Sequence, residues 1–370
     1  MDRIKRYIEC YIPIESCNLC CHYCYITQDR SFHSKLTPLT HSPEEIRTAL
    51  SVKRLGGICL INLCAGGETL LGEDILPVIR ELLEEGHFIS LVTNGTLTKR
   101  FEEIAEWPPE LLTRLFIKFS FHFLEMKRLG WMDRFAGNVR LMKQRGVSFT
   151  VEVTPSDELI PYIDELKETC LRYFGALCHV TIARDVRTYD INVLSKLPFE
   201  EYKQVWGQFD SALFDFKNKI FYRKRKEFCY AGDWCVALNL ETGRLQQCYF
   251  EKGIDNIYRG PEKPIHFEAV GRFCSLPHCY NGHAFLAFGV IPEVNAPTYA
   301  EERNRVCPDG SEWLRPEMKA FMSSRLSESN DEYNRQQKAI VCLKQLFGVR
   351  PLVKKAYRKT VLEIKSRKRK

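Results

Sequence analysis

Apolar runs of strand length alternate with amphipathic stretches over the first half of the chain. Helix signals separate the runs, the clearest being Ser42-Pro43-Glu44-Glu45, which combines an N-cap, a proline in the first helical position and a capping box. Near-continuous apolar strands separated by helices predict a parallel sheet that is buried on both faces. We therefore expect an α/β fold, a partial (β/α)6 barrel of parallel strands. The expected strands are 7–16, 57–65, 87–93, 114–122, 147–154 and 178–185.

The chemically distinctive residues of this half follow the predicted strands. The C-terminal ends of parallel barrel strands meet at one rim, where catalytic groups gather, so we expect these residues to form one site. The candidates at or after the strand ends are Cys17, Cys20, Cys21 and Cys24 (first strand), Gly66, Gly67 and Glu68 (second), Thr93 and Asn94 (third), Ser120 and His122 (fourth), Glu152 and Thr154 (fifth) and Ile182 (sixth).

The cysteines after the first strand form the most informative motif. They read Cys17-x3-Cys21-x2-Cys24, with Cys20 as an alternative third thiol. A Cys-x2-Cys pair is also compatible with half of a zinc ribbon or with a redox dithiol. Three thiolates, however, leave one iron of a 4Fe–4S cluster without a protein ligand, whereas four-cysteine clusters mainly carry electrons. An open metal position can hold a cofactor or substrate, as it does in catalytic zinc sites.

Length and composition indicate a globular rather than a membrane-spanning or secreted protein. The 370 residues are enough for more than one structural unit. The chain is 45% apolar, but no run approaches the ~20 apolar residues of a membrane span, and the start of the chain lacks the apolar segment of a signal peptide. We therefore expect a cytoplasmic protein, in which 16 cysteines indicate metal and redox chemistry rather than disulfides.

The net charge of +7 is concentrated at the end of the sequence. Residues 348–370 hold ten Lys or Arg against Glu363 and contribute +9, which leaves −2 for the rest of the chain. Basicity confined to one segment argues against a protein that coats nucleic acid. A solvated terminus is the ordinary interpretation of this segment. The segment also carries apolar residues among its charges, and the alternative is a peripheral contact with an anionic membrane or glycan.

A second group of cysteines follows the basic run at 223–226. Two short strands around the turn Glu241-Thr242-Gly243 would form a hairpin and bring Cys235 and Cys248 together at its open end. The same thiolates could instead hold a zinc ion. The candidate metal ligands of this group are Cys229, Cys235, Cys248, Cys274 and Cys279.

The first cysteine motif, with Gly66-Gly67-Glu68 after the second strand, resembles the signature of the radical S-adenosylmethionine (radical SAM) superfamily. The resemblance implies that Cys17, Cys21 and Cys24 hold a 4Fe–4S cluster. It excludes Cys20, which would break the three-then-two spacing. In this family the free iron chelates the methionine end of S-adenosylmethionine (SAM). An electron from a donor of the flavodoxin or ferredoxin type then cleaves SAM to a 5′-deoxyadenosyl radical.

The resemblance also implies contacts with SAM. The Gly-Gly-Glu motif of the family binds the amino group of the methionine, and Ser120 is a better candidate than His122 for the ribose or carboxylate. Glu152 could meet the cofactor or the substrate, and main-chain groups at 181–183 could meet the adenine. The expected cofactor-binding residues are Tyr23, Gly66, Gly67, Glu68, Thr93, Asn94, Ser120, His122, Glu152 and Ile182.

The second group resembles the SPASM and twitch extensions of radical SAM enzymes, whose Cys-x9-15-Gly-x4-Cys element is matched by Cys229, Gly243 and Cys248. The longer cysteine run of a full SPASM domain is missing, and His283 stands where a last cysteine would be expected. We therefore expect one auxiliary 4Fe–4S cluster, held by Cys229, Cys235 and Cys248 plus Cys279 or Cys274. The domains expected are a barrel (1–198), a helical bridge (199–227), a small cysteine-rich SPASM/twitch-like domain (228–310) and a helical, basic tail (311–370).

These features predict a radical SAM oxidoreductase that abstracts a hydrogen atom from its substrate. The expected outcome is oxidation or epimerisation of a carbohydrate or another polar small molecule. Peptide modification is the alternative within this class. A zinc or iron–sulfur protein that binds or senses without catalysis is the alternative from another class. The sequence names no general base or hydrogen donor.

Overall fold

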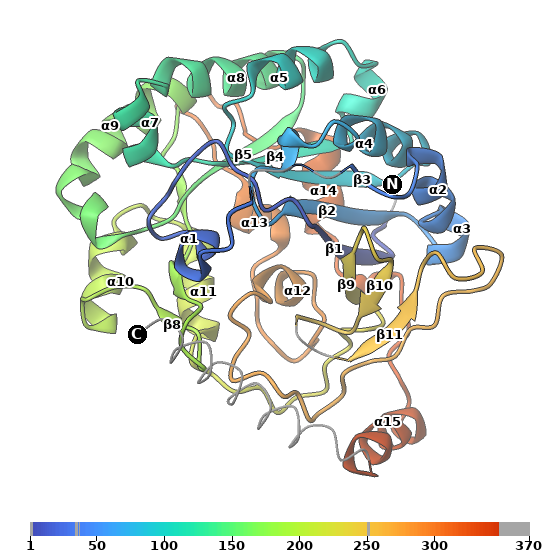
Figure 1. The fold of residues 1–370 in the computed structure, drawn as a ribbon. Helices are drawn as coiled ribbons and strands as arrows, with labels where there is room; N and C mark the ends of the chain where they lie inside the picture. Colours follow the sequence, from blue (N-terminus) through green and yellow to red (C-terminus); the bar gives the residue numbers. More distant parts are fainter. Residues whose placement is uncertain (1–2, 34–35, 37, 250–251, 348–370) are drawn as a thin grey trace.

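The computed structural model describes residues 3–33, 36, 38–249 and 252–347. Within these residues, the main sheet has the strand order β11-β10-β9-β1-β2-β3-β4-β5-β6 (Figure 1). All neighbouring strands from β1 to β6 are parallel, so the core of the predicted partial barrel is present. These strands are β1 (Arg6–Ile12), β2 (Cys59–Ala65), β3 (Phe88–Thr93), β4 (Leu115–Ser120), β5 (Ser148–Val153) and β6 (His179–Val180).

The sixth strand is shorter than predicted. After β6 the chain leaves the sheet, and β7 (Arg184–Asp185) pairs with β8 (Asn192–Val193) in a separate antiparallel ribbon. The side chain of Gln28 draws this segment towards the cysteine loop, because it donates to the carbonyl of Arg184 (2.9 Å) and accepts from the amide of Val186 (3.1 Å). The segment after β6 is therefore held by a contact with a distant part of the chain.

One face of the parallel strands is apolar and covered by helices. Residues such as Ile8, Ile61 and Leu91 are fully buried against apolar side chains of these helices, including Leu82 and Phe101. Figure 1 shows the covering helices along this side of the sheet. They are α4 (Ile75–Glu84), α5 (Thr98–Ala105), α8 (Met132–Gln144) and α9 (Ile163–Phe174).

Shorter helices connect these elements. They are α1 (Tyr25–Asp29), α2 (Pro43–Ala49), α3 (Val52–Leu55), α6 (Pro109–Leu112) and α7 (Phe123–Leu129), with 3₁₀ turns η1 (Thr69–Leu71), η2 (Asp157–Tyr162) and η3 (Leu326–Glu328).

Alternate residues of each strand point to the opposite face of the sheet, which is not apolar throughout. Its positions nearer the start of each strand are apolar and pack against C-terminal helices. Its later positions are polar, and several of them, such as Asn62, Ser90 and His179, are buried, so this face is covered without being apolar throughout. The polar positions are Glu9, Asn62, Ser90, Lys118, Ser120, Glu152 and His179. The helices on this side include α11 (Ala212–Ile220), α12 (His283–Ala287), α13 (Tyr299–Arg303) and α14 (Pro316–Ser323), preceded by α10 (Phe199–Gly207).

The segment after α11 extends the same sheet. The strand β9 (Cys235–Asn239) lies parallel to β1, with Tyr7 opposite Cys235. The predicted hairpin is present, because β10 (Arg244–Gln246) pairs antiparallel with β9, and β11 (Gly253–Asn256) follows β10. The hairpin therefore continues the barrel sheet through β1 rather than forming a sheet of its own.

The last described helix is α15 (Arg335–Phe347). Two apolar residues of this helix, Ile340 and Leu343, are exposed, and Val341 makes a buried contact. The basic segment at 350–370, for which we predict a peripheral membrane or glycan contact, lies outside the described residues. Within the described part of the chain, no helix is both long enough and apolar enough to cross a membrane.

Candidate cofactor and metal sites

The loop after β2 holds the cysteine loop in place. Backbone amides of Gly67 and Glu68 donate to the carbonyls of Ile14 (2.5 Å) and Ser16 (2.9 Å), so the two loops run side by side beyond the sheet. A Cβ atom on Gly67 would lie 1.9 Å from the carbonyl oxygen of Ser16. Glycine is therefore required at this position by close backbone approach, as the Gly-Gly-Glu motif suggested.

The thiols of the first motif lie in a partly buried environment. The amide of Leu19 donates to the Cys17 sulfur (3.4 Å), and the Asn94 side-chain amide lies 3.8 Å from it. Burial raises the pKa of Cys17 to about 11 and raises the pKa of Cys21 further, with added repulsion from Cys24 and Cys17. Cys17 and Cys24 both raise the pKa of Cys21, so the three thiols lie near one another in the loop, and thiols bind metal groups as thiolates. This donor set fits an iron–sulfur cluster.

Cys20 differs from its neighbours in the loop. Its side chain is exposed, whereas Cys21 is buried. Its backbone amide donates to the Glu125 carboxylate (3.3 Å), which fixes the loop. Exposure is consistent with the exclusion of Cys20 from the predicted ligands.

The carboxylate of Glu68 is enclosed by hydrogen bonds. Only 2% of this residue is exposed, and the carboxylate accepts from the Thr93 hydroxyl (2.6 Å), the Asn94 amide (2.7 Å) and the Leu70 amide (3.0 Å). Burial raises its pKa, and these three donors act against that rise. Glu68 thus joins the end of β2 to the turn after β3, and it brings the predicted residues Thr93 and Asn94 beside the cysteine loop.

Two tyrosines of the cysteine segment are also oriented by the strand ends. The Tyr23 hydroxyl lies 2.7 Å from Nδ1 of His122, and burial lowers the pKa of His122 to about 4. A neutral imidazole accepts at one ring nitrogen, so Tyr23 can donate this bond. The Tyr25 hydroxyl donates to the Gly66 carbonyl (2.7 Å). His122 therefore positions Tyr23, next to the last cysteine.

The remaining predicted cofactor residues occupy different surroundings. Ser120 and Glu152 are cross-strand neighbours on the polar face and are partly exposed. The Glu152 carboxylate is ion-paired with Arg303 of α13, a partner that sequence reasoning did not identify. Ile182 is buried just after β6.

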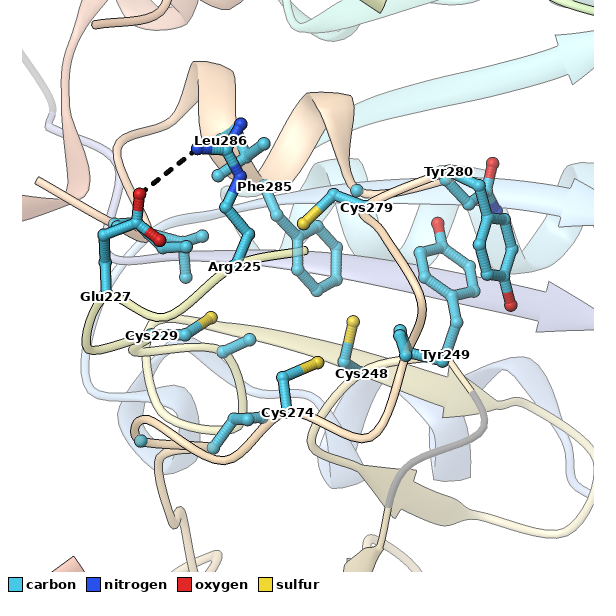
Figure 2. A pocket seen from close by; sticks show the side chains of 18 residues that line it. Arg225, Glu227, Cys229, Cys248, Tyr249, Cys274, Cys279, Tyr280, Phe285 and Leu286 are labelled. Atoms are coloured by element: carbon cyan, nitrogen blue, oxygen red, sulfur yellow. Dashed lines mark hydrogen bonds and ion pairs between the residues drawn. The ribbon is translucent and has the colours of Figure 1, made fainter. Parts of the chain in front are cut away.

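Four cysteines of the second group line one pocket. Figure 2 shows the sulfurs of Cys229, Cys248, Cys274 and Cys279 pointing into the same space. Two backbone hydrogen bonds between Cys229 and Gly271 (3.0 and 2.9 Å) bring the first of these cysteines beside the segment that carries Cys274. The rest of the lining is largely apolar and includes Leu276, Phe285 and Val290.

Cys235 is not among the residues that line this pocket, although burial raises its pKa and it lies close enough to Cys229 for that thiol to raise it further. It is the first residue of β9 and is buried in the apolar cluster behind the sheet. The hairpin itself is correct, but its last pair is Gln246 with Ala237, and Cys248 lies beyond the end of β10. Parallel pairing with β1, which sequence reasoning missed, determines which way Cys235 faces.

The lining residues surround about 550 Å³ of space, part of which is open to solvent. Thiolates are ligands for zinc and for iron–sulfur clusters alike. In the part of the chain that is described, no three His, Cys, Asp or Glu side chains are arranged to hold a single metal ion. A four-thiol donor set around a wider, apolar space fits a 4Fe–4S group.

Cationic side chains lie at the edge of the pocket. Arg225 is ion-paired with Glu227 (3.2 Å) and acts on Cys279, whose pKa is raised by burial and lowered by this arginine (Figure 2). Lys224 donates to the backbone carbonyl of Cys274. The basic run before the cysteines therefore contacts the segment that carries two of them.

Comparison with known proteins identifies the region around the first motif. Residues 11–119 match the radical SAM superfamily. The matched radical SAM region includes the cysteine loop, the Gly-Gly-Glu turn and strands β2 to β4.

Similar proteins cover only part of the chain. An 82-residue stretch is 38% identical to a probable GTP 3′,8-cyclase of Sulfurisphaera tokodaii, which is 22% of this chain and 24% of that protein. Streptococcus suis SuiB bound to S-adenosylmethionine superposes with a TM-score of 0.49 and 14% identity, over 70% of this chain and 64% of that chain. Native anSMEcpe with bound AdoMet superposes with a TM-score of 0.46 and 14% sequence identity, over 68% of this chain and 78% of that chain. The chain thus spans about a quarter of the curated relative and less than two thirds of SuiB.

Proposed function

We propose that this protein is a radical SAM enzyme. Cys17, Cys21 and Cys24 would hold a 4Fe–4S cluster, and the strand ends from Gly66 to Asn94 would hold SAM. The observation that carries the proposal is the three-thiol loop fastened against the Gly-Gly-Glu turn, within the region that matches the superfamily. When bound, the cluster and SAM together supply a 5′-deoxyadenosyl radical that can abstract a hydrogen atom.

The protein's own part is to bind and orient. Gly67 permits the close approach of the two loops, and Glu68 holds the turn after β3 so that Asn94 faces the Cys17 sulfur. His122 and Tyr23 fix the residue before the last cysteine. The polar face of the sheet, with Ser120 and Glu152, would receive the rest of the cofactor and the substrate.

Anaerobic reconstitution with iron and sulfide, followed by dithionite and SAM, tests this function. The wild-type protein is expected to form 5′-deoxyadenosine, and Cys17→Ala is expected to abolish it. Cys20→Ala is the matched control, because this thiol lies in the same loop and is exposed. A wild-type protein that binds its full iron and yet forms no 5′-deoxyadenosine would leave only the binding or sensing alternative.

We further propose one auxiliary 4Fe–4S cluster held by Cys229, Cys248, Cys274 and Cys279. The support is their common pocket, in which Cys235 has no part. A cluster with four protein thiolates suits electron transfer. Such an electron acceptor favours a two-electron oxidation of a carbohydrate or other polar small molecule over epimerisation. A peptide substrate remains the second candidate, and deuterium transfer from labelled sugars or peptides into 5′-deoxyadenosine would distinguish the two.

A further inference from the structure

A group of buried cations lies on the polar face of the sheet, and the proposed cluster and SAM ligands do not account for it. Lys118 is on β4, two residues before Ser120. Lys217 comes from α11 and Arg303 from α13, the helices packed on this side. Each of the three influences the ionisation of Glu152 on β5, so they surround one region of the face.

Lys118 has no ionic partner of its own. The acidic residue nearest to it in register is Glu152, on the adjacent strand, but that carboxylate is ion-paired with Arg303. Among the described residues Lys118 makes neither a hydrogen bond nor an ion pair, and its side chain keeps accessible surface. Burial acts against its charge, but Tyr299 and Glu152 outweigh that effect and raise its pKa. Within the described residues Lys118 is therefore a charged amine on an inner surface that Glu152 and Glu9 influence without a direct ion pair.

Lys217 is buried at a cost to stability. Only 4% of it is exposed, and its amine donates to the Thr181 hydroxyl (2.7 Å) at the end of β6. Burial lowers its pKa well below the usual value, and the nearby cations Arg184 and Arg303 lower it further. A buried lysine surrounded by other cations destabilises the folded protein unless a bound anion compensates its charge.

The acidic residues of this region are already engaged or neutral. The Glu9 carboxylate accepts from Tyr7 (2.7 Å) and Asn62 (2.9 Å). Glu302 is fully buried, and neither of its carboxylate oxygens has a hydrogen-bond partner within the described residues. Burial raises the pKa of Glu302 to about 8, so it is mostly protonated at neutral pH. Glu9 and Glu152 are thus the ionised carboxylates that act on Lys118, against the cations Lys118, Lys217 and Arg303.

We propose that Lys118 and Lys217 bind an anionic group of the substrate, a carboxylate or a phosphate, on the polar face below the strand ends. This inference rests on the proposed function for the identity of the ligand as a substrate. An anion placed there would pair with Lys118 and offset the repulsion between Lys217 and its cationic neighbours. It would also hold the rest of the molecule near the strand ends, where Ser120 and Glu152 lie.

The anion site is testable without turnover. Thermal unfolding of the reconstituted protein is compared in 10 mM phosphate, in 10 mM acetate and in chloride of equal ionic strength. Phosphate or acetate is expected to raise the Tm by about 2 °C or more over chloride. The anion that acts identifies whether the group is a phosphate or a carboxylate. No gain from either anion over chloride would overturn the proposal.

Variants locate the effect. Lys118→Met and Lys217→Met are expected to lose the anion-dependent gain in Tm, whereas Lys219→Met, an exposed lysine on the same helix as Lys217, is expected to keep it. An unchanged gain in both buried-site variants would overturn the proposal. If Lys217→Met does not fold, the anion-dependent change in Tm of Lys118→Met alone tests the proposal.

The carboxylate of SAM is the competing occupant. SAM affinity is therefore measured by equilibrium binding to the wild type and to Lys118→Met. The proposal expects less than a threefold change, and a loss of tenfold or more would assign Lys118 to the cofactor and overturn the substrate site. The two proposals can fail independently. A protein that binds phosphate through these lysines but forms no 5′-deoxyadenosine would support the anion site and refute the proposed enzymatic function.

Discussion

Around the first site, single positions are constrained by space and by burial rather than by surface chemistry. Gly67 has no room for a side chain because the Ser16 carbonyl is in van der Waals contact with its backbone. The Glu68 carboxylate accepts hydrogen bonds from residues at the end of β3. The Glu302 carboxyl group is buried and has no hydrogen-bond partner within the described residues. The sequence motif indicated the glycine and Glu68, but nothing in the local sequence distinguishes Glu302 from its exposed neighbour Glu301.

Gly67→Ala is expected to destabilise the protein by roughly 1–3 kcal/mol, because the added Cβ forces the two loops apart. The amount of iron held by Cys17, Cys21 and Cys24 should fall together with the stability. Gly137→Ala is the control, since a Cβ there meets nothing within 4 Å in helix α8 and should stabilise by about 0.5–1 kcal/mol. Urea unfolding and iron analysis measure both effects. Equal stability of the two variants would contradict the close approach of the loops.

Glu302→Gln is expected to change how stability depends on pH. The pKa of Glu302 is about 8 in the folded protein and about 4.3 in an unfolded chain, so the native state binds one more proton between these values. The wild type should therefore lose up to about 1.4 kcal/mol of unfolding free energy per pH unit as the pH rises through this window. The glutamine variant lacks this loss, so its advantage should grow from pH 5 to pH 8.

Chemical unfolding of both proteins at several pH values checks the sign of the Glu302 effect. Glu317→Gln, at an exposed position of α14, serves as the control and should follow the wild-type slope. Parallel pH profiles for wild type and Glu302→Gln would show that this acid is ionised in the folded protein.

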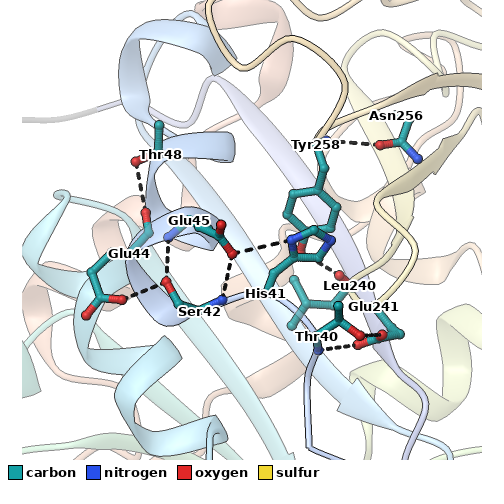
Figure 3. Close-up of polar contacts among 10 residues, drawn as sticks. All are labelled: Thr40, His41, Ser42, Glu44, Glu45, Thr48, Leu240, Glu241, Asn256 and Tyr258. Carbon is teal, nitrogen blue, oxygen red and sulfur yellow. Dashed lines mark hydrogen bonds and ion pairs between the residues drawn. The ribbon is translucent and has the colours of Figure 1, made fainter.

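Elements with local signals were predicted well, and elements that depend on distant partners were not. The capping box of α2 is present as the sequence indicated, with the Ser42 hydroxyl accepting from the Glu45 amide (3.2 Å) and the Glu45 carboxylate accepting from the Ser42 amide (2.9 Å; Figure 3). The parallel pairing of β9 with β1 was missed, since strand patterns do not identify a partner. The shortened sixth strand was missed for the same reason.

The start of α2 also joins the barrel to the hairpin. The Thr40 amide and hydroxyl donate to the Glu241 carboxylate at the hairpin turn, and the His41 ring stacks on Tyr258 with centroids 3.5 Å apart (Figure 3). Residues that follow the cysteine loop are thus in contact with the turn of the second cysteine segment.

Ser42→Ala is expected to cost about 1 kcal/mol, because it removes the side-chain acceptor of the helix N-terminus. Ser51→Ala is the matched control, since Ser51 occupies the N-cap position of α3 but makes no capping hydrogen bond, and its loss should be near zero. Denaturant midpoints of the two variants measure the difference. Similar costs for both would mean that the capping bond contributes nothing to stability.

At the scale of the whole molecule, β1 links the two thiol groups. The first cysteine loop follows its C-terminal end, and its edge pairs with β9, which leads into the four-cysteine pocket (Figure 1). One continuous sheet therefore sets the arrangement of the proposed radical-generating site relative to the proposed electron acceptor.

Iron content tests the assignment of the pocket. The reconstituted wild type is expected to hold about eight irons per chain, by counting four for each cluster, and Cys274→Ser about four. Cys235→Ser should keep about eight, because this residue lies in the core rather than in the pocket. Four irons in the wild type would remove the auxiliary cluster, and a loss confined to Cys235→Ser would restore the ligand set predicted from the sequence.

The sequence by itself determined the features that depend on short-range spacing: the three-thiol motif, the Gly-Gly-Glu turn, the order of strands β1 to β5 and the hairpin between β9 and β10. These depend on side-chain periodicity, turn chemistry and ligand spacing, which are local. Only the tertiary structure decided which thiols share a pocket, that Cys235 is buried at the start of β9, and that Lys118 and Lys217 lie close enough for Lys118 to influence the ionisation of Lys217. Each of these depends on strand pairing or on helix packing between segments far apart in the chain, and local patterns carry no information about such partners.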